Sequence, residues 1–302
     1  MKLFFFYDEN FRPLRDNLVS SLHDDFELRE YYLPDLGVMK NRAGGGVPTY
    51  LYKAHRVRDA IDEVAEGEVL IFCDVDVQFF KPVKSTIEAC MTDDLDILLQ
   101  SEFEDIGVNI GFMAMRNVPS VRSFWEHVHK EIERLGGLDQ RIVNNILYSG
   151  RALQDFGLRW DRFPVTLWAS SLAASGRIPP DILLHHANFT AQRCVGGDPS
   201  VKLAQMHEMR RFLAEDPDGL SAFLSSVQHD PTILDYRDRH FGARRPGEVW
   251  ATLPEGHLAR QGGFSEKRNK KAGVSESSIL TVSEDQVSLA GVFPPTELAA
   301  VA

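Results

Sequence analysis

Hydrophobic residues recur along the chain in two alternating patterns, short apolar runs and longer segments with helical spacing. Residues 3–7 are an apolar run, and leucines then recur at four-residue spacing from Leu14 to Leu22, behind Pro13. The run predicts a buried strand, and the four-residue spacing predicts an amphipathic helix. Residues 26–33 alternate apolar with charged side chains before a proline, which indicates an edge strand. A strand, a helix and a second strand in this order are typical of an α/β fold.

The same alternation continues through the middle of the chain. Helical spacing predicts helices over 50–64, over 121–135 and from 139 onward, and apolar runs predict strands over 69–73, 95–100, 107–115 and 182–184. The run at 107–115 contains glycines, which inside a strand often mark a ligand close to the backbone. We therefore expect an α/β domain in which strands alternate with helices.

The pattern changes toward the C-terminal end of the chain. Apolar residues beyond residue 200 predict helices that pack against the domain. From residue 262 onward a glycine pair, a basic cluster and a serine-rich stretch indicate a linker or a weakly ordered, flexible tail. We expect an α/β domain at 1–210, a helical extension at 211–261 and the tail at 262–302.

Two aspartates separated by one residue follow the apolar run at 69–73. A strand buried on both faces does not end in two carboxylates unless something compensates their charge. Ligands of open α/β sheets bind at the carboxyl ends of the strands, and carboxylate oxygens suit Mg²⁺ or Mn²⁺. Asp74 and Asp76 are therefore candidate metal ligands. Taken alone, the pair fits a solvent-exposed turn better, so the rest of the chain must decide.

The net charge of the chain indicates which classes of binding partner to expect. The 302-residue chain has 33 Lys and Arg against 44 Asp and Glu, a formal net charge of −11. Nucleic-acid binders normally present a basic face, so we expect no nucleic-acid partner. A phosphorylated ligand stays compatible with the acidic balance, because a bound metal ion supplies local positive charge.

The lengths of the apolar segments and the spacing of the cysteines indicate in which compartment of the cell we expect the protein. The N-terminal apolar run is too short for a signal-peptide core, and no segment approaches the roughly eighteen apolar residues of a membrane-spanning helix. The 3 cysteines are widely spaced and form no Cys-x-x-Cys pair, which is typical of a reduced protein without a zinc site. We expect a cytoplasmic protein without a transmembrane segment.

Polar residues follow three of the predicted strands. The first strand is followed by Asp8 and Asn10, the middle one by the aspartate pair, and the late one by His185 and His186. Because these strand ends meet at one edge of an α/β sheet, the side chains are able to act together. An imidazole beside two carboxylates makes a mixed oxygen and nitrogen site, which favours Mn²⁺ over Mg²⁺.

Four segments, in this order, resemble motifs of one enzyme family. Ile71–Val77 resembles the metal-binding Asp-x-Asp strand of nucleotide-sugar glycosyltransferases with the GT-A fold, and Asn109–Met113 resembles their Asn-x-Gly segment. Asp139 and Gln140, with an asparagine shortly after, resemble the family's Asp-Gln helix start. His186–Thr190 is similar to the late His-Ala-Asn motif of the nucleotide-diphospho-sugar transferase group, which is related to glycosyltransferase families 8 and 77.

The resemblance covers about residues 1–205 and implies a GT-A-like, Rossmann-type mixed sheet with helices on both faces and a metal site. In that family, residues at the positions of Asp74 and Asp76 hold Mn²⁺ (or Mg²⁺) against the diphosphate of the donor. A histidine completes the metal shell. The Ala-Asn that follows favours His186 over His185 for this role.

The same resemblance implies roles around the donor. Asp8 and Asn10 match the positions that hold the nucleoside, and Asp139 and Gln140 match those beside the sugar and the acceptor. Further donor contacts are implied for Lys53 or Arg56, Asp74, Asn109 and Lys202. The interval between His186 and Lys202 is longer than in the related families.

The implied activity is a metal-dependent, retaining transfer of a sugar from a nucleotide-diphosphate sugar, first of all a UDP-sugar. The acceptor, whether glycan, lipid, protein or small molecule, is not encoded in these motifs. Asp139 and Gln140 are the only candidates for a covalent nucleophile, and a front-face displacement fits equally.

Two alternatives stay open. A haloacid-dehalogenase-like, Mg²⁺-dependent phosphohydrolase also uses Asp-x-Asp after a strand. That class expects a Gly-Thr pair directly after the second aspartate, where Val77 and Gln78 stand here. A non-catalytic domain that binds a nucleotide sugar is the second alternative.

Overall fold

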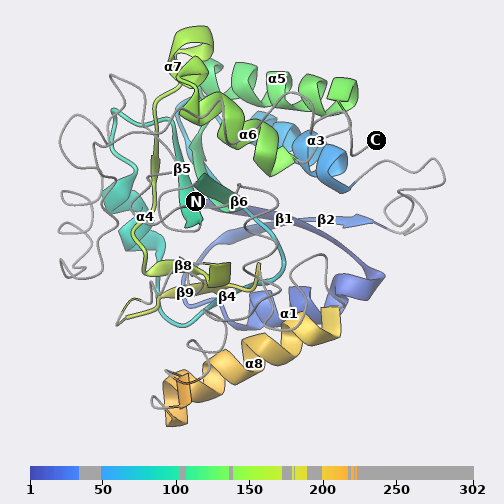
Figure 1. The fold of residues 1–302 in the computed structure, drawn as a ribbon, viewed down its shortest axis with the longest axis vertical. Helices are drawn as coiled ribbons and strands as arrows, with labels where there is room; N and C mark the ends of the chain where they lie inside the picture. The colour runs from blue at the N-terminus through green and yellow to red at the C-terminus, as the bar shows by residue number, and fades with distance from the viewer. Residues whose placement is uncertain are drawn as a thin grey trace, which may run out of the picture.

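The computed structural model describes residues 1–33, 49–102, 107–135, 139–171, 179, 181–188, 199–216, 219–220 and 222. Within them the chain forms a mixed α/β fold around a six-stranded sheet (Figure 1). The strands of this sheet are β1 (Lys2–Asp8), β2 (Glu27–Leu33), β3 (Val69–Cys73), β5 (Ile97–Glu102), β6 (Gly107–Arg116) and β7 (Trp160–Arg162). They lie in the order β2-β1-β3-β6-β5-β7, with β6 antiparallel to both of its neighbours and all other pairs parallel.

A second, smaller sheet lies beside the first. It is formed by β4 (Val77–Phe79), β9 (Leu184–His186) and β8 (Leu167–Ala169), in that order. Strand β9 pairs antiparallel with β4 and parallel with β8. Because β4 follows β3 after three residues, the segment that contains the aspartate pair connects the two sheets.

Helices cover both faces of the main sheet (Figure 1). They are α1 (Arg12–Ser20), α3 (Thr49–Asp62), α4 (Lys84–Cys90), α5 (Pro119–Leu135), α6 (Asp139–Tyr148), α7 (Arg151–Phe156) and α8 (Pro199–Glu215), with a 3₁₀ turn, η1, at Glu9–Phe11. Helices α3, α5, α6 and α7 contribute to the hydrophobic core on one face. Helices α1, α4 and α8 and the small sheet contribute to the core on the other.

Strand β3 shows how the sequence builds two cores from one sheet. Leu70 and Phe72 are buried in the first core, and Ile71 and Cys73 are buried in the second. Successive side chains of a strand point to opposite faces, so a continuous apolar run suits a strand that is covered on both sides. Asp74 and Asp76 therefore follow directly after the part of the chain that is buried on both faces of the sheet.

Helix α5 follows the amphipathic pattern seen in the sequence. Val121, Phe124, Trp125, Val128 and Ile132 recur at spacings of three and four residues, and all are buried. This spacing places them on one side of a helix, facing α3 and the sheet. Charged residues occupy the opposite side, where Lys130 and Glu126 form an i,i+4 ion pair.

The structure confirms the predicted α/β class, the mixed sheet and the helices on both of its faces. Strand β2 is an edge strand, as its alternating pattern indicated. The late strand differs from expectation, because β9 begins at Leu184 and includes both histidines instead of ending before them. The pairing of Val77 with His186 and of Gln78 with His185 draws the histidines into the small sheet.

Several sequence-based predictions fall at the limits of the described residues. Helix α8 continues through residues 210 and 211, and the predicted division into 1–210, 211–261 and 262–302 stays a prediction. The glycine-rich segment before α3 (41–48), the Gly136-Gly137 pair after α5 and the tail from 262 lie outside the described residues.

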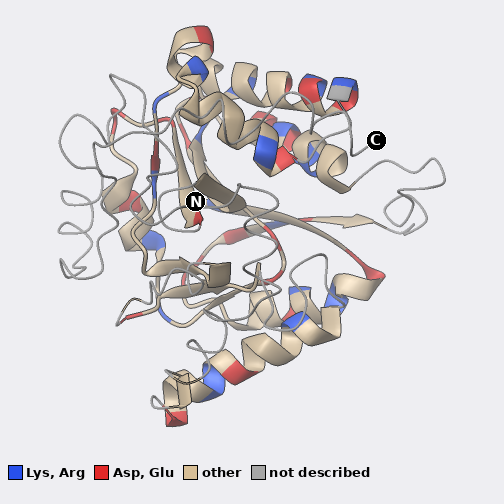
Figure 2. Cartoon of the chain, viewed as in Figure 1, with Lys and Arg blue, Asp and Glu red and all other residues tan. Residues whose placement is uncertain are grey.

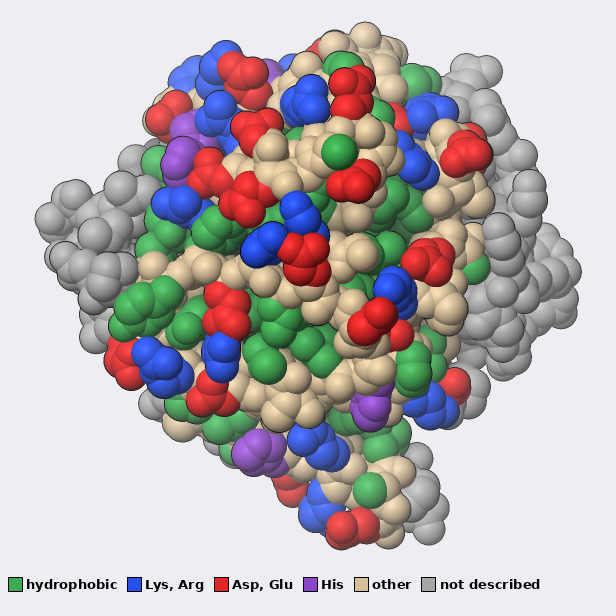
Figure 3. Space-filling model, turned by 180° about the vertical axis from the view of Figure 1, so that it is seen from behind, with side chains coloured by type: hydrophobic (Ala, Val, Ile, Leu, Met, Phe, Trp, Pro, Cys, Tyr) green, Lys and Arg blue, Asp and Glu red, His purple; other side chains and the backbone are tan. Residues whose placement is uncertain are grey.

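Charges of both signs are mixed over the surface. Figure 2 shows Lys and Arg interspersed with Asp and Glu along α3, α5 and α8. The opposite face carries acidic and basic side chains next to one another, with apolar ones between them (Figure 3). Among the helices that the structure describes, none has the length and apolar character needed to cross a membrane.

Candidate active site

The segment Asp74-Val75-Asp76 is fixed by backbone hydrogen bonds at both ends. The Asp74 N–H donates to the Gly111 carbonyl oxygen of β6 at 2.7 Å. The Ala187 N–H, just after β9, donates to the Asp76 carbonyl oxygen at 2.8 Å. The aspartate pair is therefore held between the two sheets and is not an open solvent turn.

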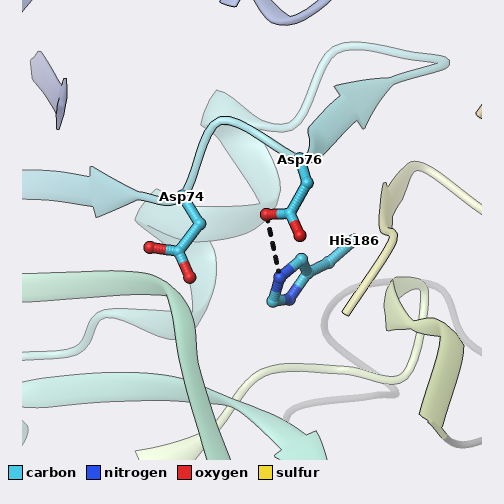
Figure 4. Close-up of side chains that lie close together, drawn as sticks. All are labelled: Asp74, Asp76 and His186. Atoms are coloured by element: carbon cyan, nitrogen blue, oxygen red, sulfur yellow. Dashed lines mark ion pairs between the residues drawn. The ribbon is translucent and has the colours of Figure 1, made fainter. Parts of the chain in front are cut away.

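Asp74, Asp76 and His186 converge on one point (Figure 4). One ligand atom from each, a carboxylate oxygen or a ring nitrogen, lies within 4.8 Å of the others. In an octahedral shell at about 2.1 Å, neighbouring ligand atoms are about 3 Å apart and opposite ones about 4 Å. Small side-chain movements therefore suffice to bring all three onto one ion, and the oxygen and nitrogen donors suit Mn²⁺.

The hydrogen bonds around His186 determine which ring nitrogen carries the proton. Gln100 donates its Nε2 to the Leu167 carbonyl oxygen at 3.2 Å, so its Oε1 faces His186 Nδ1 at 2.9 Å. Nδ1 therefore carries a hydrogen, and Nε2 is directed at Asp76 Oδ1, 3.3 Å away. The unprotonated Nε2 of His186 and Oδ1 of Asp76 are both hydrogen-bond acceptors, so their approach is favourable only with a proton or a cation between them. This arrangement fits a metal ligand whose other nitrogen is oriented by a buried amide.

Gly111 leaves the space that the His186 ring occupies. A Cβ atom built at this position would lie 2.0 Å from Cε1 of His186. A side chain at residue 111 would therefore displace the ring from Asp76. The glycines of this strand were expected to mark a close approach, and at Gly111 the approaching group is the histidine itself.

His185 lies on the other side of β9, away from the aspartates. Gln78 donates Nε2 to its Nδ1 at 3.0 Å, and its ring stacks between Phe80 and Trp168. Burial, together with the nearby His186, lowers the pKa of His185 to about 3. Of the two candidate histidines, the structure brings His186 to the carboxylates.

Each aspartate also has a lysine partner. Lys53 Nζ lies 2.7 Å from Asp74 Oδ1, and Lys202 Nζ forms an ion pair with Asp76 Oδ2. Burial acts to lower the pKa of Lys53, but Asp74 and Asp139 outweigh it and the pKa ends above its ordinary value. Burial acts to raise the pKa of Asp76, and Lys202 and His186 reverse this and hold it well below its usual range. Two carboxylates and two ammonium groups thus balance in charge.

These groups form one wall of a cavity of about 300 Å³. It is lined by Phe6, Tyr7, Asp8, Phe11, Thr49, Tyr50, Lys53, Asp74, Val75, Asp76, Ile110, Asp139, Gln140 and Lys202. Most residues predicted for the site, from five separate parts of the sequence, therefore meet at one cavity. The lining residues do not include Asn10, which is exposed on η1, or Asn109 and His186, which are buried.

Two further carboxylates, those of Asp8 and Asp139, line the cavity. Asp8 is buried at the end of β1, and its Oδ1 accepts a hydrogen bond from the Phe11 N–H at 3.1 Å, which caps η1. Asp139 opens α6, and its Oδ1 accepts from the Gln140 N–H at 2.8 Å. Loss of solvent around the carboxyl group raises the pKa of Asp139 to about 6, although Lys53 opposes the shift.

Asn144 connects α6 to β6. Its Oδ1 accepts from the Val108 N–H at 2.7 Å and its Nδ2 donates to the Val108 carbonyl oxygen at 2.8 Å. This side chain, not that of Asn145, is the one that ties the Asp-Gln helix start to the strand carrying Asn109 and Gly111. The link fixes how far Asp139 and Gln140 reach over the cavity.

Two polar residues of β5 were not singled out from the sequence. Gln100 orients His186, and Glu102 accepts hydrogen bonds from Asn109 Nδ2 at 2.6 Å and from Gln140 Nε2 at 3.2 Å. Burial raises the pKa of Glu102, against the effect of the hydrogen bond from Asn109. Gln100, in the strand predicted over 95–100, was a signal, because buried polar groups need partners. Glu102 lies beyond the predicted strand, and only the structure includes it in β5.

Comparisons with known proteins come from structure rather than sequence. No family model and no curated protein matches the chain. A glycosyltransferase involved in the glycosylation of the major capsid of PBCV-1 has a TM-score of 0.46 and 11% identity, over 69% of this chain and 100% of its own. The glycosyltransferase GlyE of Streptococcus pneumoniae TIGR4 has a TM-score of 0.42 and 14% identity, over 69% of this chain and 64% of its own.

Mouse xyloside xylosyltransferase 1, in its apo form, has a TM-score of 0.41 and 11% identity, over 62% of this chain and 97% of its own. Each of these three solved structures is a glycosyltransferase of low sequence identity to this chain.

Proposed function

We propose that this protein is a metal-dependent glycosyltransferase that moves a sugar from a nucleotide-diphosphate sugar to an acceptor. The observation that carries the proposal is the convergence of Asp74, Asp76 and His186 beside two lysines at the wall of one cavity. A cation held there by two carboxylates and an imidazole suits a diphosphate, whose negative charge also attracts the lysines. Mn²⁺ fits this donor set better than Mg²⁺.

The chain's own residues supply binding and orientation around the donor. Lys53 and Lys202, now paired with carboxylates, are placed to share their charge with phosphate oxygens. When bound, a divalent ion acts as a Lewis acid that stabilises the charge on the departing diphosphate. Asp8 lies at the end of the cavity formed by β1 and η1, where we place the nucleoside. A UDP-sugar is the donor to test first.

Asp139 and Gln140 lie at the start of α6, where we place the sugar and the acceptor. Gln140 is an amide and a weak nucleophile. Asp139 forms a hydrogen bond with the Gln140 backbone and is exposed to the charge of Lys53. A retaining transfer on the face of the departing diphosphate therefore fits these residues better than a covalent intermediate on Asp139.

The phosphohydrolase alternative finds less support. An aspartate nucleophile must attack a phosphorus atom with a free carboxylate oxygen. Both oxygens of Asp76 are engaged, Oδ1 by His186 and Oδ2 by Lys202, whereas Lys53 engages only Oδ1 of Asp74. The Gly-Thr pair that this class expects directly after the second aspartate is replaced by Val77 and Gln78. The binding-only alternative shares the same site and is separated from catalysis by measuring turnover.

Thermal unfolding of the purified protein with nucleotide diphosphates tests the site. A ligand that binds only the native state raises the unfolding temperature. We expect a rise with UDP and Mn²⁺ together, and a much smaller one with either alone. The rise should vanish in Asp76→Asn and persist in Asp62→Asn, a matched change at an exposed residue of α3. Equal rises in both variants, or none with any nucleotide diphosphate in the wild-type protein, would contradict the proposal.

A further inference from the structure

Glu102 ends β5 as a buried carboxylate close to the cavity wall, with 1% of its surface exposed. The structure surrounds it with side-chain amides, from Asn109 at 2.6 Å, Gln140 at 3.2 Å and Asn188 at 3.4 Å. Glu102 does not line the cavity, but Gln140 does. Desolvation of a buried charge is unfavourable, and these amide donors compensate for it.

The orientation of two of these amides is fixed from their far sides. Asn109 Oδ1 accepts from the Gly111 N–H at 2.7 Å, so its NH₂ group is directed at Glu102. Asn188 Oδ1 accepts from the Ser171 N–H at 3.1 Å, so its NH₂ group is directed at Glu102 as well. Backbone N–H groups cannot exchange roles, so this assignment does not depend on telling amide oxygen from nitrogen. Glu102 is therefore an acceptor on the side of both asparagines.

Gln140 is the third amide, and Glu102 determines which of its ends faces the cavity. Since the carboxylate accepts, the Gln140 Nε2 turns toward it, and the Oε1 is left for the cavity that this side chain lines. The Gln140 backbone is held independently, because its N–H donates to Asp139 and its carbonyl oxygen accepts from Asn144 Nδ2 at 2.8 Å. Only the end of the side chain remains to be oriented.

We propose that Glu102 is a positioning residue that directs the Gln140 amide oxygen toward the donor sugar. This inference rests on the proposed function. In the transfer, the bond between the anomeric carbon and the diphosphate oxygen breaks, and its electron pair leaves with the diphosphate. The acceptor oxygen forms the new bond to the same carbon, and its proton passes to the departing diphosphate.

Positive charge builds on the anomeric carbon and ring oxygen while the old bond breaks. An amide oxygen held toward the sugar stabilises that charge, whereas an NH₂ group in the same place opposes it. A dipole fixed in advance acts without reorganisation during the step. Glu102 therefore contributes to the transition state through Gln140 rather than to donor binding.

Glu102→Gln tests the proposal, because the neutral amide oxygen left facing Asn109 and Gln140 is a weaker acceptor than the carboxylate and holds the Gln140 Nε2 toward it less strongly. We expect kcat to fall by about tenfold or more, in line with the effect of losing one preorganised dipole. The KM for the donor and the Kd for UDP with Mn²⁺ should stay within about twofold, because Glu102 touches neither the metal ligands nor the phosphate-binding lysines. Glu66→Gln, at an exposed residue before β3, is the matched control and should change neither constant.

A double-mutant cycle with Gln140→Ala separates positioning from a general loss of packing. If Glu102 acts through Gln140, then adding Glu102→Gln to Gln140→Ala should lower kcat by less than about twofold further. Effects of the two changes that multiply, or a wild-type kcat in Glu102→Gln, would overturn the positioning role.

Two further outcomes, a Glu102→Gln variant that fails to fold for a reason unrelated to Gln140 and a wild-type protein that turns over no donor, are distinguished from a failed positioning role as follows. If Glu102→Gln does not fold, Glu102→Asp keeps the charge with a shorter reach and should fold with an intermediate kcat and an unchanged KM. A wild-type kcat in that variant overturns the role. A wild-type protein that binds UDP with Mn²⁺ but turns over no donor overturns the proposed catalysis itself, before any change at Glu102.

Discussion

At the scale of single residues, the site combines groups that the sequence pointed to with groups that it did not. Asp74, Asp76, His186, Lys53 and Lys202 were singled out by motif or by resemblance, and the structure places them together. The roles assigned to them stay predictions. Gln100 was not singled out because apolar residues dominate the strand predicted over 95–100, and its partner His186 is distant in sequence. Glu102 lies beyond that predicted strand, and its contact with Gln140 depends on the folded structure.

Gly111→Ala tests the space beneath His186 without changing any ligand. The added methyl group would meet the ring at a Cβ to Cε1 distance of 2.0 Å, so the imidazole must leave Asp76. We expect the affinity for Mn²⁺ in the presence of UDP to fall about 10- to 100-fold, as is typical when the support of a metal ligand is disturbed. Isothermal titration measures the change.

The control for this change is the His186→Ala background. There the ring is absent, so Gly111→Ala should lower the affinity no further. An undiminished affinity in the single variant, or an equal loss in both backgrounds, would place the metal elsewhere.

The raised pKa of Asp139 predicts how the free energy of unfolding depends on pH. Its pKa is about 6 in the folded protein and about 4 in an unfolded chain. Between these values the folded state holds a proton that the unfolded state has released, so this group makes the free energy of unfolding fall as the pH rises from about 4 to about 6. The contribution is constant above and below that window.

Asp139→Asn removes this contribution. Denaturant unfolding in metal-free buffer should show the wild type losing stability relative to the variant as the pH rises through the window. A difference that is flat from pH 4 to pH 7, or that slopes the other way, would mean that the carboxyl group is solvated in the folded protein.

At the scale of elements, the sequence predicted the long helices and every strand of the main sheet except β7, because their apolar patterns extend over several residues. The three-residue strands β4, β7 and β8 were not predicted, since such segments are too short to show a period. Strand β9 was displaced for a related reason. Pairing with β4, which is distant in sequence, decides that His185 and His186 are extended.

Asn144 gives an element-scale prediction, because it fastens α6 to β6. Asn144→Ala leaves the buried N–H and carbonyl groups of Val108 without these partners. The free energy of unfolding should fall by about 1–3 kcal/mol. Asn145→Ala, one residue further along the same helix, should have a smaller effect. Equal losses in a denaturant titration would show that the helix does not depend on this link.

A second prediction at this scale concerns helix α8, which contains Lys202, the ion-pair partner of Asp76. Lys202→Met removes a cation that competes for the carboxylate. Mn²⁺ alone should then bind at least as tightly as in the wild type, while UDP with Mn²⁺ binds more weakly. Lys130→Met, at an exposed residue of α5, is the control. Titrations in which both affinities fall together would assign Lys202 to the fold rather than to the diphosphate.

At the scale of the whole molecule, the arrangement explains why a turn between two sheets becomes a site. The main sheet supplies Asp74 at the end of β3, the small sheet supplies His186 from β9, and Asp76 lies where the chain passes from one to the other. The α/β class could be predicted from the alternation of runs and helices. The strand order, with β6 reversed between β3 and β5, could not, because it depends on pairing between distant segments.

The central claim is that metal held by Asp74, Asp76 and His186 drives the release of UDP from a UDP-sugar. The most direct measurement is UDP release by the purified protein with Mn²⁺, with EDTA, and in Asp76→Asn beside the control Asp62→Asn. Removing one ligand should lower the rate by several powers of ten, and each power corresponds to about 1.4 kcal/mol of transition-state stabilisation. We predict release with Mn²⁺ in the wild type and in Asp62→Asn, and almost none with EDTA or in Asp76→Asn. Release that persists with EDTA, or at the wild-type rate in Asp76→Asn, would contradict the claim.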